Sequence, residues 1–438
     1  MEQCTVNITL NTCQQAAVDE FLKFLMSPTQ TELVISGYAG TGKTTLVQHL
    51  LDQMPRFETA AAALGSNLKC INEVAVTATT RKAASVIADM LGVEATTVHS
   101  YLGLILRNDY QTGETYLQLS KNAKPASNTL IFVDEASFIN SELLSNIRQQ
   151  TPNCKVVYMG DPCQLISVNS SQSPIFDGKI PTVKLTTVMR NDGAIDALSA
   201  QYRDTVLSGI FRPIKLDNKK VVHVTGDVFK SMIDAAFTDK DYKPDDSAKV
   251  LAWTNSRVLD YNNYIAQVRG CTARFSPGET LINNSVIISK KTNDILASTD
   301  QRVVVKTVEP EVQHGIEGWL VTLRNIGQVF VPESQFEKTQ LLKRLSKSKN
   351  WKDYFNIKDT WADLRPAYAA TVHKSQGSTY DRVFVDLSDI GSNNVSDEVA
   401  RLLYVAISRA SSQVILYGEL PDKYLGKFNV TVKEVLSL

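Results

Sequence analysis

Residues 37–45 read Gly-Tyr-Ala-Gly-Thr-Gly-Lys-Thr-Thr and match the phosphate-binding pattern G-x-x-x-x-G-K-[ST]. The apolar run before them is typical of a buried strand, and residues 46–52 continue as a predicted helix. A glycine turn that leads into a helix presents backbone N–H groups to phosphate. We expect the Lys43 ammonium to reach the terminal phosphates and the Thr44 hydroxyl to bind Mg²⁺. Further nucleotide contacts are predicted at Gly37, Gly40, Thr41, Gly42 and Thr45.

A second buried strand is predicted at residues 129–134, and it ends in two adjacent carboxylates, Asp134 and Glu135. In a parallel sheet, the carboxyl ends of the strands face the ligand crevice. We therefore expect Asp134 to hold Mg²⁺ and Glu135 to polarise the attacking water. Residues 156–165 repeat this layout, and Gln164 is placed where an amide can sense the terminal phosphate.

Two arginines, Arg190 and Arg409, come from beyond this first set of strands and helices. An arginine held across a cleft stabilises the charge of the transition state and connects hydrolysis to closure of the cleft. Near the N-terminus, Gln14 lies just inside a predicted helix, where its amide could bind an adenine edge, although an exposed helical glutamine is the commoner case. Together these residues suit hydrolysis of a nucleoside triphosphate.

The whole chain of 438 residues has room for two to four domains. Its 46 basic and 46 acidic residues balance, which argues against a protein that coats polyanions but leaves room for a local basic groove. The six cysteines form no C-x-x-C pair, so we expect reduced thiols. No apolar run is long enough for a membrane span and no signal-peptide pattern is present, so we expect a cytoplasmic protein without a membrane partner.

Strands and helices alternate in two sets, which predicts an α/β fold with two lobes, residues 1–190 and 191–438. Residues 101–127 interrupt the first set and contain a predicted β-hairpin around Gly113. Residues 270–365 interrupt the second set with short β runs that suggest a small antiparallel barrel. Aromatic and basic residues at 347–361 suit single-stranded nucleic acid, but a solvated helix that packs its aromatics on the barrel explains them equally well.

The ordered set of motifs resembles the superfamily 1 helicases, in the branch typified by RecD and the T-even phage Dda helicase. The most specific segments are Gly-Asp-Pro-Cys-Gln-Leu at 160–165, His-Lys-Ser-Gln-Gly at 373–377 and Tyr-Val-Ala-Ile-Ser-Arg-Ala at 404–410. They occur in the family's order, and the matching segments span nearly the whole chain.

This resemblance implies two RecA-like P-loop lobes, with a pin hairpin inserted in the first and an SH3-like barrel inserted in the second. It implies ATP- and Mg²⁺-dependent movement 5′ to 3′ on single-stranded DNA, with strand separation at the pin. Forked DNA is an expected partner, and single-strand-binding or replisome proteins are further candidates. The compactness of the chain favours a phage origin. A phage-encoded protein would act in the cytoplasm of the host cell.

Individual roles follow by resemblance. Gln14 would bind adenine, Gln164 would be the coupling sensor, and Arg190 and Arg409 would be the arginine fingers. Gln376 and Gly377 would also contact the nucleotide. The implied DNA contacts are Thr80, His99, Tyr116, Thr254, Asn255 and His373, of which Tyr116 would be the pin aromatic.

The chain departs from the family pattern at Tyr38 and Thr79, where proline is usual. Neither change removes a catalytic group. Two rival functions stay open: an ATP-driven translocase that displaces proteins or remodels recombination intermediates without unwinding, and a non-motor nucleotide-switched binding protein. A small-molecule kinase would leave the second lobe without a role, and no additional carboxylate cluster supports a nuclease.

Overall fold

The structure is a computed structural model that describes residues 9–63, 71–166, 173–189, 193–244, 246–271, 274–289 and 294–424. The chain forms two compact units, each assembled from separate stretches of sequence. Unit 1 contains Met1–Ile105, Gln118–Phe211 and Val395–Ser411. Unit 2 contains Leu106–Leu117, Arg212–Asn394 and Ser412–Leu438. Within the described residues, no helix is both long and apolar enough to cross a membrane.

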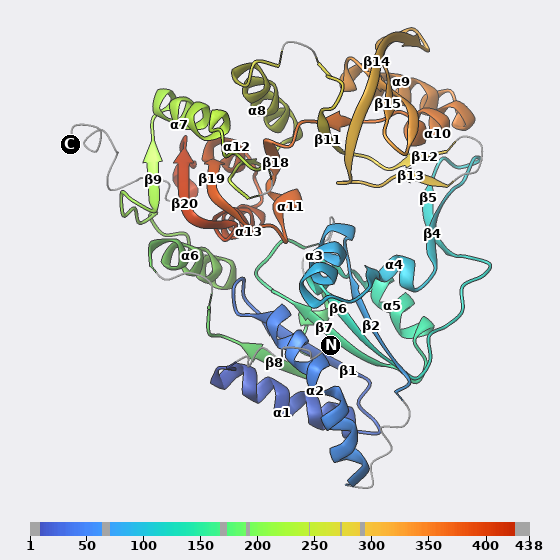
Figure 1. The fold of residues 1–438 in the computed structure, drawn as a ribbon, viewed down its shortest axis with the longest axis vertical. Coiled ribbons are helices and arrows are strands. Elements are labelled where there is room, and N and C mark those ends of the chain that lie inside the picture. Colours follow the sequence, from blue (N-terminus) through green and yellow to red (C-terminus); the bar gives the residue numbers. More distant parts are fainter. Residues whose placement is uncertain are drawn as a thin grey trace. The chain divides into compact units, whose positions relative to one another are not determined.

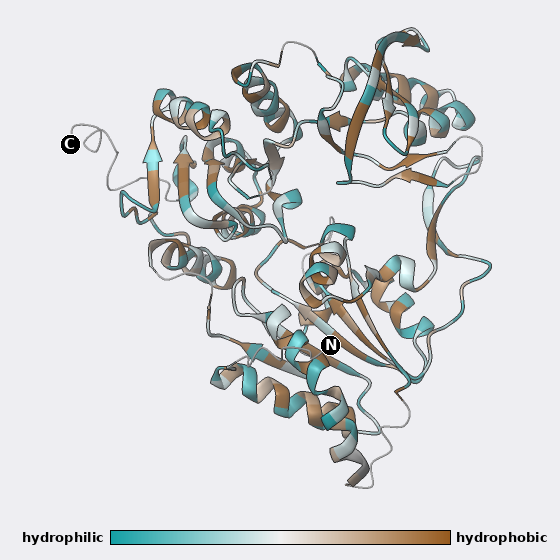
Figure 2. Ribbon diagram, viewed as in Figure 1, coloured by the Kyte–Doolittle hydropathy of each residue, from teal (hydrophilic) through white to brown (hydrophobic). Residues whose placement is uncertain are grey.

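Unit 1 is built around a six-stranded sheet with the order β3-β2-β6-β7-β1-β8, in which each described pairing is parallel. The central strands β1, β6 and β7 are short, mostly apolar runs, and Figure 2 shows their hydrophobic colouring. The strands of the sheet are β1 Glu32–Gly37, β2 Glu73–Ala78, β3 Ala95–Thr97, β6 Thr129–Asp134, β7 Lys155–Gly160 and β8 Thr182–Leu185. Because the strands are parallel, the phosphate loop, Asp134 and the turn before Gln164 all follow carboxyl ends at one edge of the sheet.

Helices cover this sheet, and α1 packs against β1 and β8 (Figure 1). Phe21 of α1 stacks on Phe132 of β6 with ring centroids 6.0 Å apart, which anchors the helix in the apolar core. Helix α13 packs against α6. The helices of unit 1 are α1 Thr12–Met26, α2 Lys43–Ala63, α3 Arg81–Leu91, α4 Val98–Tyr101, α5 Ser141–Gln150, α6 Ala194–Ser208 and α13 Ser396–Ile407.

Unit 2 contains a second sheet with the order β18-β10-β19-β20-β9. The pairs β10–β18, β10–β19 and β20–β9 are parallel. The strands are β9 Val221–Val224, β10 Ala248–Ala252, β18 Ala369–Thr371, β19 Tyr380–Asp386 and β20 Ala410–Tyr417. The accompanying helices are α7 Gly226–Thr238, α8 Asn255–Val268, α11 Val372–Ser375 and α12 Leu387–Gly391. The α/β class with parallel sheets is therefore confirmed.

An antiparallel sheet with the order β16-β15-β14-β11-β17 occupies the predicted insertion in unit 2. The strands are β11 Thr280–Asn283, β14 Arg302–Gln313, β15 Ile316–Leu323, β16 Gly327–Pro332 and β17 Leu364–Arg365, with a separate pair β12 Ile287–Ile288 and β13 Ile295–Ala297. Two helices follow β16 in sequence, α9 Gln335–Lys347 and α10 Trp351–Thr360. The SH3-like assignment of this sheet stays a prediction.

The predicted hairpin is present as β4 Leu104–Asn108 and β5 Thr115–Leu119. Its turn is closed by Gly113, which has φ +81° and donates its N–H to the Asp109 carbonyl at 2.8 Å. Residues 106–117 belong to unit 2, although the residues on either side belong to unit 1. The hairpin therefore packs with elements that lie far from it in sequence. The lobe boundary near residue 190 stays a prediction.

Candidate nucleotide and nucleic-acid site

The phosphate loop joins β1 to α2. Gly40 and Gly42 have φ +79° and +76°, a region that glycine adopts without strain. The Lys43 ammonium donates to the carbonyl oxygens of Gly37 and Tyr38 at 2.7 and 3.2 Å. Carbonyl oxygens of the loop thus bind the Lys43 ammonium, and the N-terminus of α2 follows the loop directly.

Gln14 lies against this loop, and its contact with the nucleotide stays a prediction. Its side-chain carbonyl accepts from the Asn11 N–H at 3.0 Å, and its amide donates to the Thr41 carbonyl at 3.3 Å. The residue is only 4% exposed, and a Cβ placed on Gly42 would lie 2.7 Å from its amide nitrogen. The side chain therefore caps α1 and connects that helix to the loop.

Asp134, the predicted metal ligand, is the last residue of β6. Its carboxylate accepts the Glu135 N–H at 2.8 Å. Burial raises the pKa of Asp134, and the charge of Lys43 opposes that shift. Glu135 has φ +54°, a left-handed conformation that costs about 1 kcal/mol or more for a residue with a side chain. The strained turn directs the chain away from the strand immediately after the two carboxylates.

The structure explains the two departures from the family pattern. Thr79 donates its N–H to the Asp134 carbonyl at 3.2 Å and its hydroxyl to the Glu135 carbonyl at 3.0 Å. Proline would supply neither donor. The guanidinium of Arg203, on α6, lies 4.3 Å from the centroid of the Tyr38 ring, a cation–π contact that proline would also lose.

Three side chains next to Gln164 were not predicted individually. The Tyr404 hydroxyl donates to the Asp161 carboxylate at 2.7 Å and accepts the Ala39 N–H at 3.0 Å. Arg401 donates to the carbonyls of Pro162 and Gln164 at 2.6 and 2.7 Å. Tyr404 and Asp161 both lie in the most specific motif segments, so the motifs marked each of them as a candidate. Nothing in the sequence indicated that the two side chains contact each other.

Arg409 follows α13 and is only 3% exposed. Its guanidinium donates to the Val405 carbonyl at 3.1 Å and to the Ser408 hydroxyl at 2.9 Å. It belongs to the same compact unit as the phosphate loop. Arg190, the other predicted finger, lies outside the described residues.

The predicted DNA contacts of unit 1 follow neighbouring strands. Thr80 comes after β2, and its hydroxyl caps α3 by accepting the Ala83 N–H at 3.2 Å. His99 comes after β3 and is half-buried. Burial lowers the pKa of His99, while Glu142 opposes the shift, so the imidazole is neutral at pH 7. As a neutral ring, it suits hydrogen bonding or stacking better than ion pairing with phosphate.

The predicted contacts of unit 2 also follow parallel strands. The Thr254 hydroxyl donates to the Asp389 carboxylate at 2.7 Å and accepts the Arg257 N–H at 3.3 Å. The Asn255 side-chain carbonyl accepts from Arg365 at 3.1 Å. Thr254 is therefore engaged in holding the N-terminus of α8.

His373 lies on α11, and Gln376 and Gly377 follow that helix. The neighbouring Lys374 forms an ion pair with Asp300 at 3.0 Å and a hydrogen bond with Asn284. This attaches α11 to the region around the antiparallel sheet. The structure places these predicted residues within unit 2 and the phosphate loop within unit 1.

The hairpin contacts α10. Tyr110 packs edge-on against Phe355 with centroids 5.1 Å apart, and Asn108 donates to the Asp359 carboxylate at 2.7 Å. Lys358 donates to the Thr115 hydroxyl at 3.1 Å. Phe355 of α10 thus packs against the hairpin, and the role of the other aromatics of this segment stays open between the two alternatives raised by the sequence. Tyr116, on β5, is 49% exposed.

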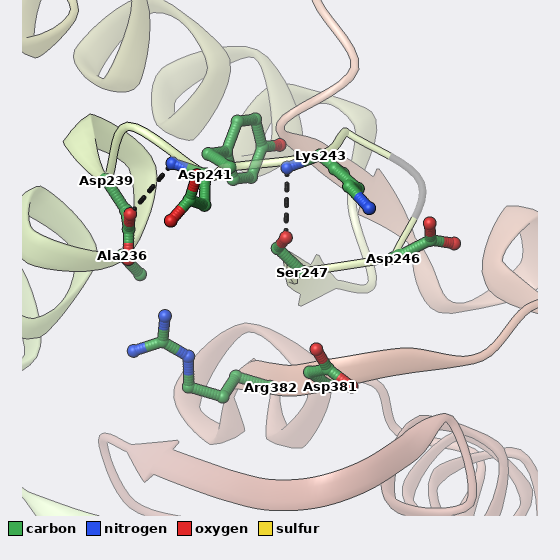
Figure 3. Close-up of a pocket in the computed structure, with 9 residues that line it drawn as sticks. Ala236, Asp239, Asp241, Lys243, Asp246, Ser247, Asp381 and Arg382 are labelled. Atoms are coloured by element: carbon green, nitrogen blue, oxygen red, sulfur yellow. Dashed lines mark hydrogen bonds between the residues drawn. The ribbon is translucent and has the colours of Figure 1, made fainter.

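A separate hollow of about 350 Å³ lies in unit 2, between the loop after α7 and the start of β19 (Figure 3). Its side chains include Asp239, Asp241, Arg382 and Lys243. None of the predicted site residues lines it.

Comparisons with known proteins match two segments of the chain to family models and find relatives that cover most of it. The family model of the AAA domain matches residues 9–216, and that of the UvrD-like helicase C-terminal domain matches residues 366–417. An uncharacterized protein of Acanthamoeba polyphaga mimivirus is 23% identical over 92% of this chain and 99% of its own length. The ATP-dependent DNA helicase Dda of Enterobacteria phage T4 is 24% identical over 87% of this chain and 93% of its own length.

Among solved structures, the Pif1 helicase from Bacteroides in complex with ADP-AlF3 and single-stranded DNA covers 95% of this chain and 94% of its own. The two chains are 14% identical, and the TM-score is 0.49.

The two family models and the similarity to Dda support the predicted family, the superfamily 1 helicases of the branch that includes RecD and Dda. They also support the predicted enzyme class, an ATP-dependent helicase.

Proposed function

We propose that this helicase moves 5′ to 3′ along single-stranded DNA and unwinds the duplex that it meets. The observation that supports the proposal is that one compact unit contains the phosphate loop, Asp134, Glu135, Gln164 and Arg409. Lys43 lies near enough to Asp134 to influence the pKa of its carboxyl, and Tyr404 joins the loop to Asp161, three residues before Gln164. The direction of movement rests on the resemblance to the RecD and Dda branch.

The residues of the loop fit a nucleoside triphosphate. A Cβ on Gly37 would lie 2.6 Å from the Thr41 hydroxyl, so the loop needs glycine to keep its shape. The Thr44 hydroxyl and the Asp134 carboxylate offer the oxygen ligands that Mg²⁺ prefers. When bound, Mg²⁺ would neutralise charge on the phosphate oxygens.

The remaining groups would act on the water and on the developing charge. Glu135 would orient the water and accept its proton, and Gln164 would report the terminal phosphate. Arg409 and Arg190 would stabilise the transition-state charge. Lys43 would exchange the carbonyls of Gly37 and Tyr38 for phosphate oxygens.

The base and further nucleotide contacts would come from Gln14, Gln376 and Gly377. For Gln14, binding of adenine requires its amide to leave the Thr41 carbonyl or to share its donors.

Each unit offers its own groups for DNA. Thr80 and His99 would contact the strand from unit 1, and Thr254, Asn255 and His373 would do so from unit 2. We infer that ATP binding and hydrolysis make the grips of the two units alternate, which moves the strand in steps.

The hairpin would separate the strands, with Tyr116 as its exposed aromatic. A separating element must be rigid, and the contacts of Tyr110 and Asn108 with α10 give the hairpin a firm backing. The antiparallel sheet next to α9 and α10 in sequence would be the SH3-like insertion.

ATP hydrolysis measured with and without a single-stranded oligonucleotide tests the hydrolytic part of this proposal. We expect the oligonucleotide to stimulate the wild-type protein. Lys43→Ala should abolish hydrolysis, and Glu135→Gln should lower kcat by about 10²-fold or more while ATP still binds. Slow hydrolysis that DNA does not stimulate would instead indicate a nucleotide-switched binding protein. Normal hydrolysis by Lys43→Ala would show that ATP hydrolysis does not depend on the phosphate loop.

A further inference from the structure

A continuous chain of hydrogen bonds joins the phosphate loop to the turn that carries Gln164. It runs from the Ala39 N–H to the Tyr404 hydroxyl, and from that hydroxyl to the Asp161 carboxylate. The second oxygen of the same carboxylate accepts the Cys163 N–H at 2.9 Å. Tyr404 is 2% exposed and Asp161 is fully buried, so water does not replace these contacts.

We propose that Tyr404 is a positioning residue that sets the phosphate loop relative to the Gln164 turn and thereby aligns the terminal phosphate for hydrolysis. This inference rests on the proposed function of the loop and of Gln164.

The element that carries Tyr404 makes the inference specific. Tyr404 lies on α13, the helix that ends two residues before Arg409. One turn earlier on α13, Arg401 donates to the carbonyls of Pro162 and Gln164. Arg401 is itself fixed by an ion pair with Asp397 at 2.7 Å. A single helix therefore holds the loop, the Gln164 turn and the predicted finger in one arrangement.

The hydroxyl is suited to this task because it donates and accepts at the same time. Burial raises the pKa of Tyr404 well above its ordinary value, and the charge of Asp161 adds to the effect. The hydroxyl consequently keeps its proton throughout the neutral range. Loss of the hydroxyl would leave the buried Asp161 carboxylate and the partly buried Ala39 N–H each one partner short.

Steady-state ATP hydrolysis by Tyr404→Phe, with saturating single-stranded DNA, tests this directly. The ring remains, so packing is kept and only the two hydrogen bonds are lost. We expect kcat to fall about tenfold or more, the usual scale for losing a hydrogen bond to a charged group. The KM for ATP should stay within about twofold, since the groups of Gly42, Lys43 and Thr44 are untouched.

Tyr158→Phe is the matched control. Tyr158 is fully buried on β7 of the same sheet and donates to the Glu32 carboxylate at 2.9 Å. Glu32 begins β1, so this pair lies at the edge opposite the phosphate loop. The control should lose stability but keep its kcat. An equal kcat for Tyr404→Phe and Tyr158→Phe would overturn the inference, as would a raised KM with unchanged kcat.

Asp161→Asn supplies a second and independent variant. We expect it to lower kcat without raising KM, and the double variant with Tyr404→Phe should be no slower than the slower single variant, because both remove one link. Additive losses would overturn the inference. If Tyr404→Phe does not fold, a normal kcat for Asp161→Asn would also overturn the inference. Absence of hydrolysis in the wild type would instead refute the proposed function.

Discussion

Thr254 shows how a predicted ligand contact can serve the fold. Its hydroxyl donates to Asp389 and accepts from the Arg257 N–H, and its own N–H also donates to Asp389 at 2.8 Å. We expect Thr254→Ala to cost about 1–2 kcal/mol of stability, because it removes the cap of α8 and a partner of the Asp389 carboxylate. Thermal unfolding measures this loss.

Thr254→Ser is the control, since serine keeps the hydroxyl. It should restore most of the melting temperature. If alanine and serine have the same stability and alanine weakens only DNA binding, the hydroxyl serves DNA and not the fold.

At the scale of single residues, the sequence located most readily the segments whose structure depends on a local pattern. The phosphate loop and the Asp134–Glu135 pair are short segments whose geometry follows from their own residues. Tyr404 could not be paired with Ala39 or Asp161, because 365 and 243 residues separate them in the chain. Thr79 looked like a defect in the motif, and only the structure shows which carbonyls it contacts.

At the scale of elements, the hairpin depends on its contact with α10. A Cβ on Gly113 would lie 2.4 Å from the ring of Trp351, whereas a Cβ on Gly315 would meet nothing within 4 Å. Both glycines have positive φ, +81° and +77°, so alanine imposes a similar backbone cost at each. We expect Gly113→Ala to destabilise the protein by about 1–3 kcal/mol more than Gly315→Ala, since it overpacks the contact.

The same pair of variants tests the role of the hairpin. Gly113→Ala should slow unwinding of a forked duplex while its DNA-stimulated ATP hydrolysis stays near that of Gly315→Ala. Equal unwinding by the two variants would argue against a strand-separating hairpin. The comparison needs only unwinding and hydrolysis rates under one set of conditions.

A buried cation on α9 gives that helix a pH-dependent stability. Lys338 is 8% exposed and donates to the Trp361 carbonyl at 2.8 Å. Burial lowers the pKa of Lys338 from 10.5 to about 8, and Asp363 and Asp359 oppose the shift. Between these two pH values the unfolded chain therefore binds more protons than the folded chain. Burial of the charged ammonium lowers the free energy of unfolding by its full amount below pH 8, and this cost disappears above pH 10.5.

Lys338→Met removes this cost. We expect the stability of the variant relative to wild type to fall by about 2 kcal/mol between pH 7 and pH 9.5. The reason is that Lys338 of the wild type loses its proton as the pH rises, which stabilises the wild type and not the variant. Melting temperatures at the two pH values measure the change, with the exposed Lys343→Met as control. A difference that does not vary with pH would mean that Lys338 is not buried as a cation.

The sequence predicted the strands themselves but not the elements against which they pack. The glycine turn predicted a hairpin, but no local pattern indicated that it packs on α10, about 240 residues later. The aromatics at 351–361 fitted either DNA or packing, and the contact of Phe355 with Tyr110 shows packing for that residue. Such a choice depends on tertiary contacts, which periodicity does not contain.

At the scale of the whole molecule, alternating strands and helices predicted two α/β sets with parallel sheets. They did not predict that each compact unit combines distant stretches, with α13 joining unit 1 and residues 106–117 joining unit 2. Chain order alone favours contiguous domains, whereas packing of α13 on α6 determines where that helix belongs.

Unwinding of two partial duplexes, one with a 5′ single-stranded tail and one with a 3′ tail, tests the central claim most directly. ATP and Mg²⁺ are present, and Lys43→Ala is the control. We predict that the wild type unwinds only the 5′-tailed duplex and that Lys43→Ala unwinds neither. Unwinding from the 3′ tail would contradict the proposed direction. DNA-stimulated hydrolysis without unwinding of either duplex would contradict the helicase mechanism and favour a translocase.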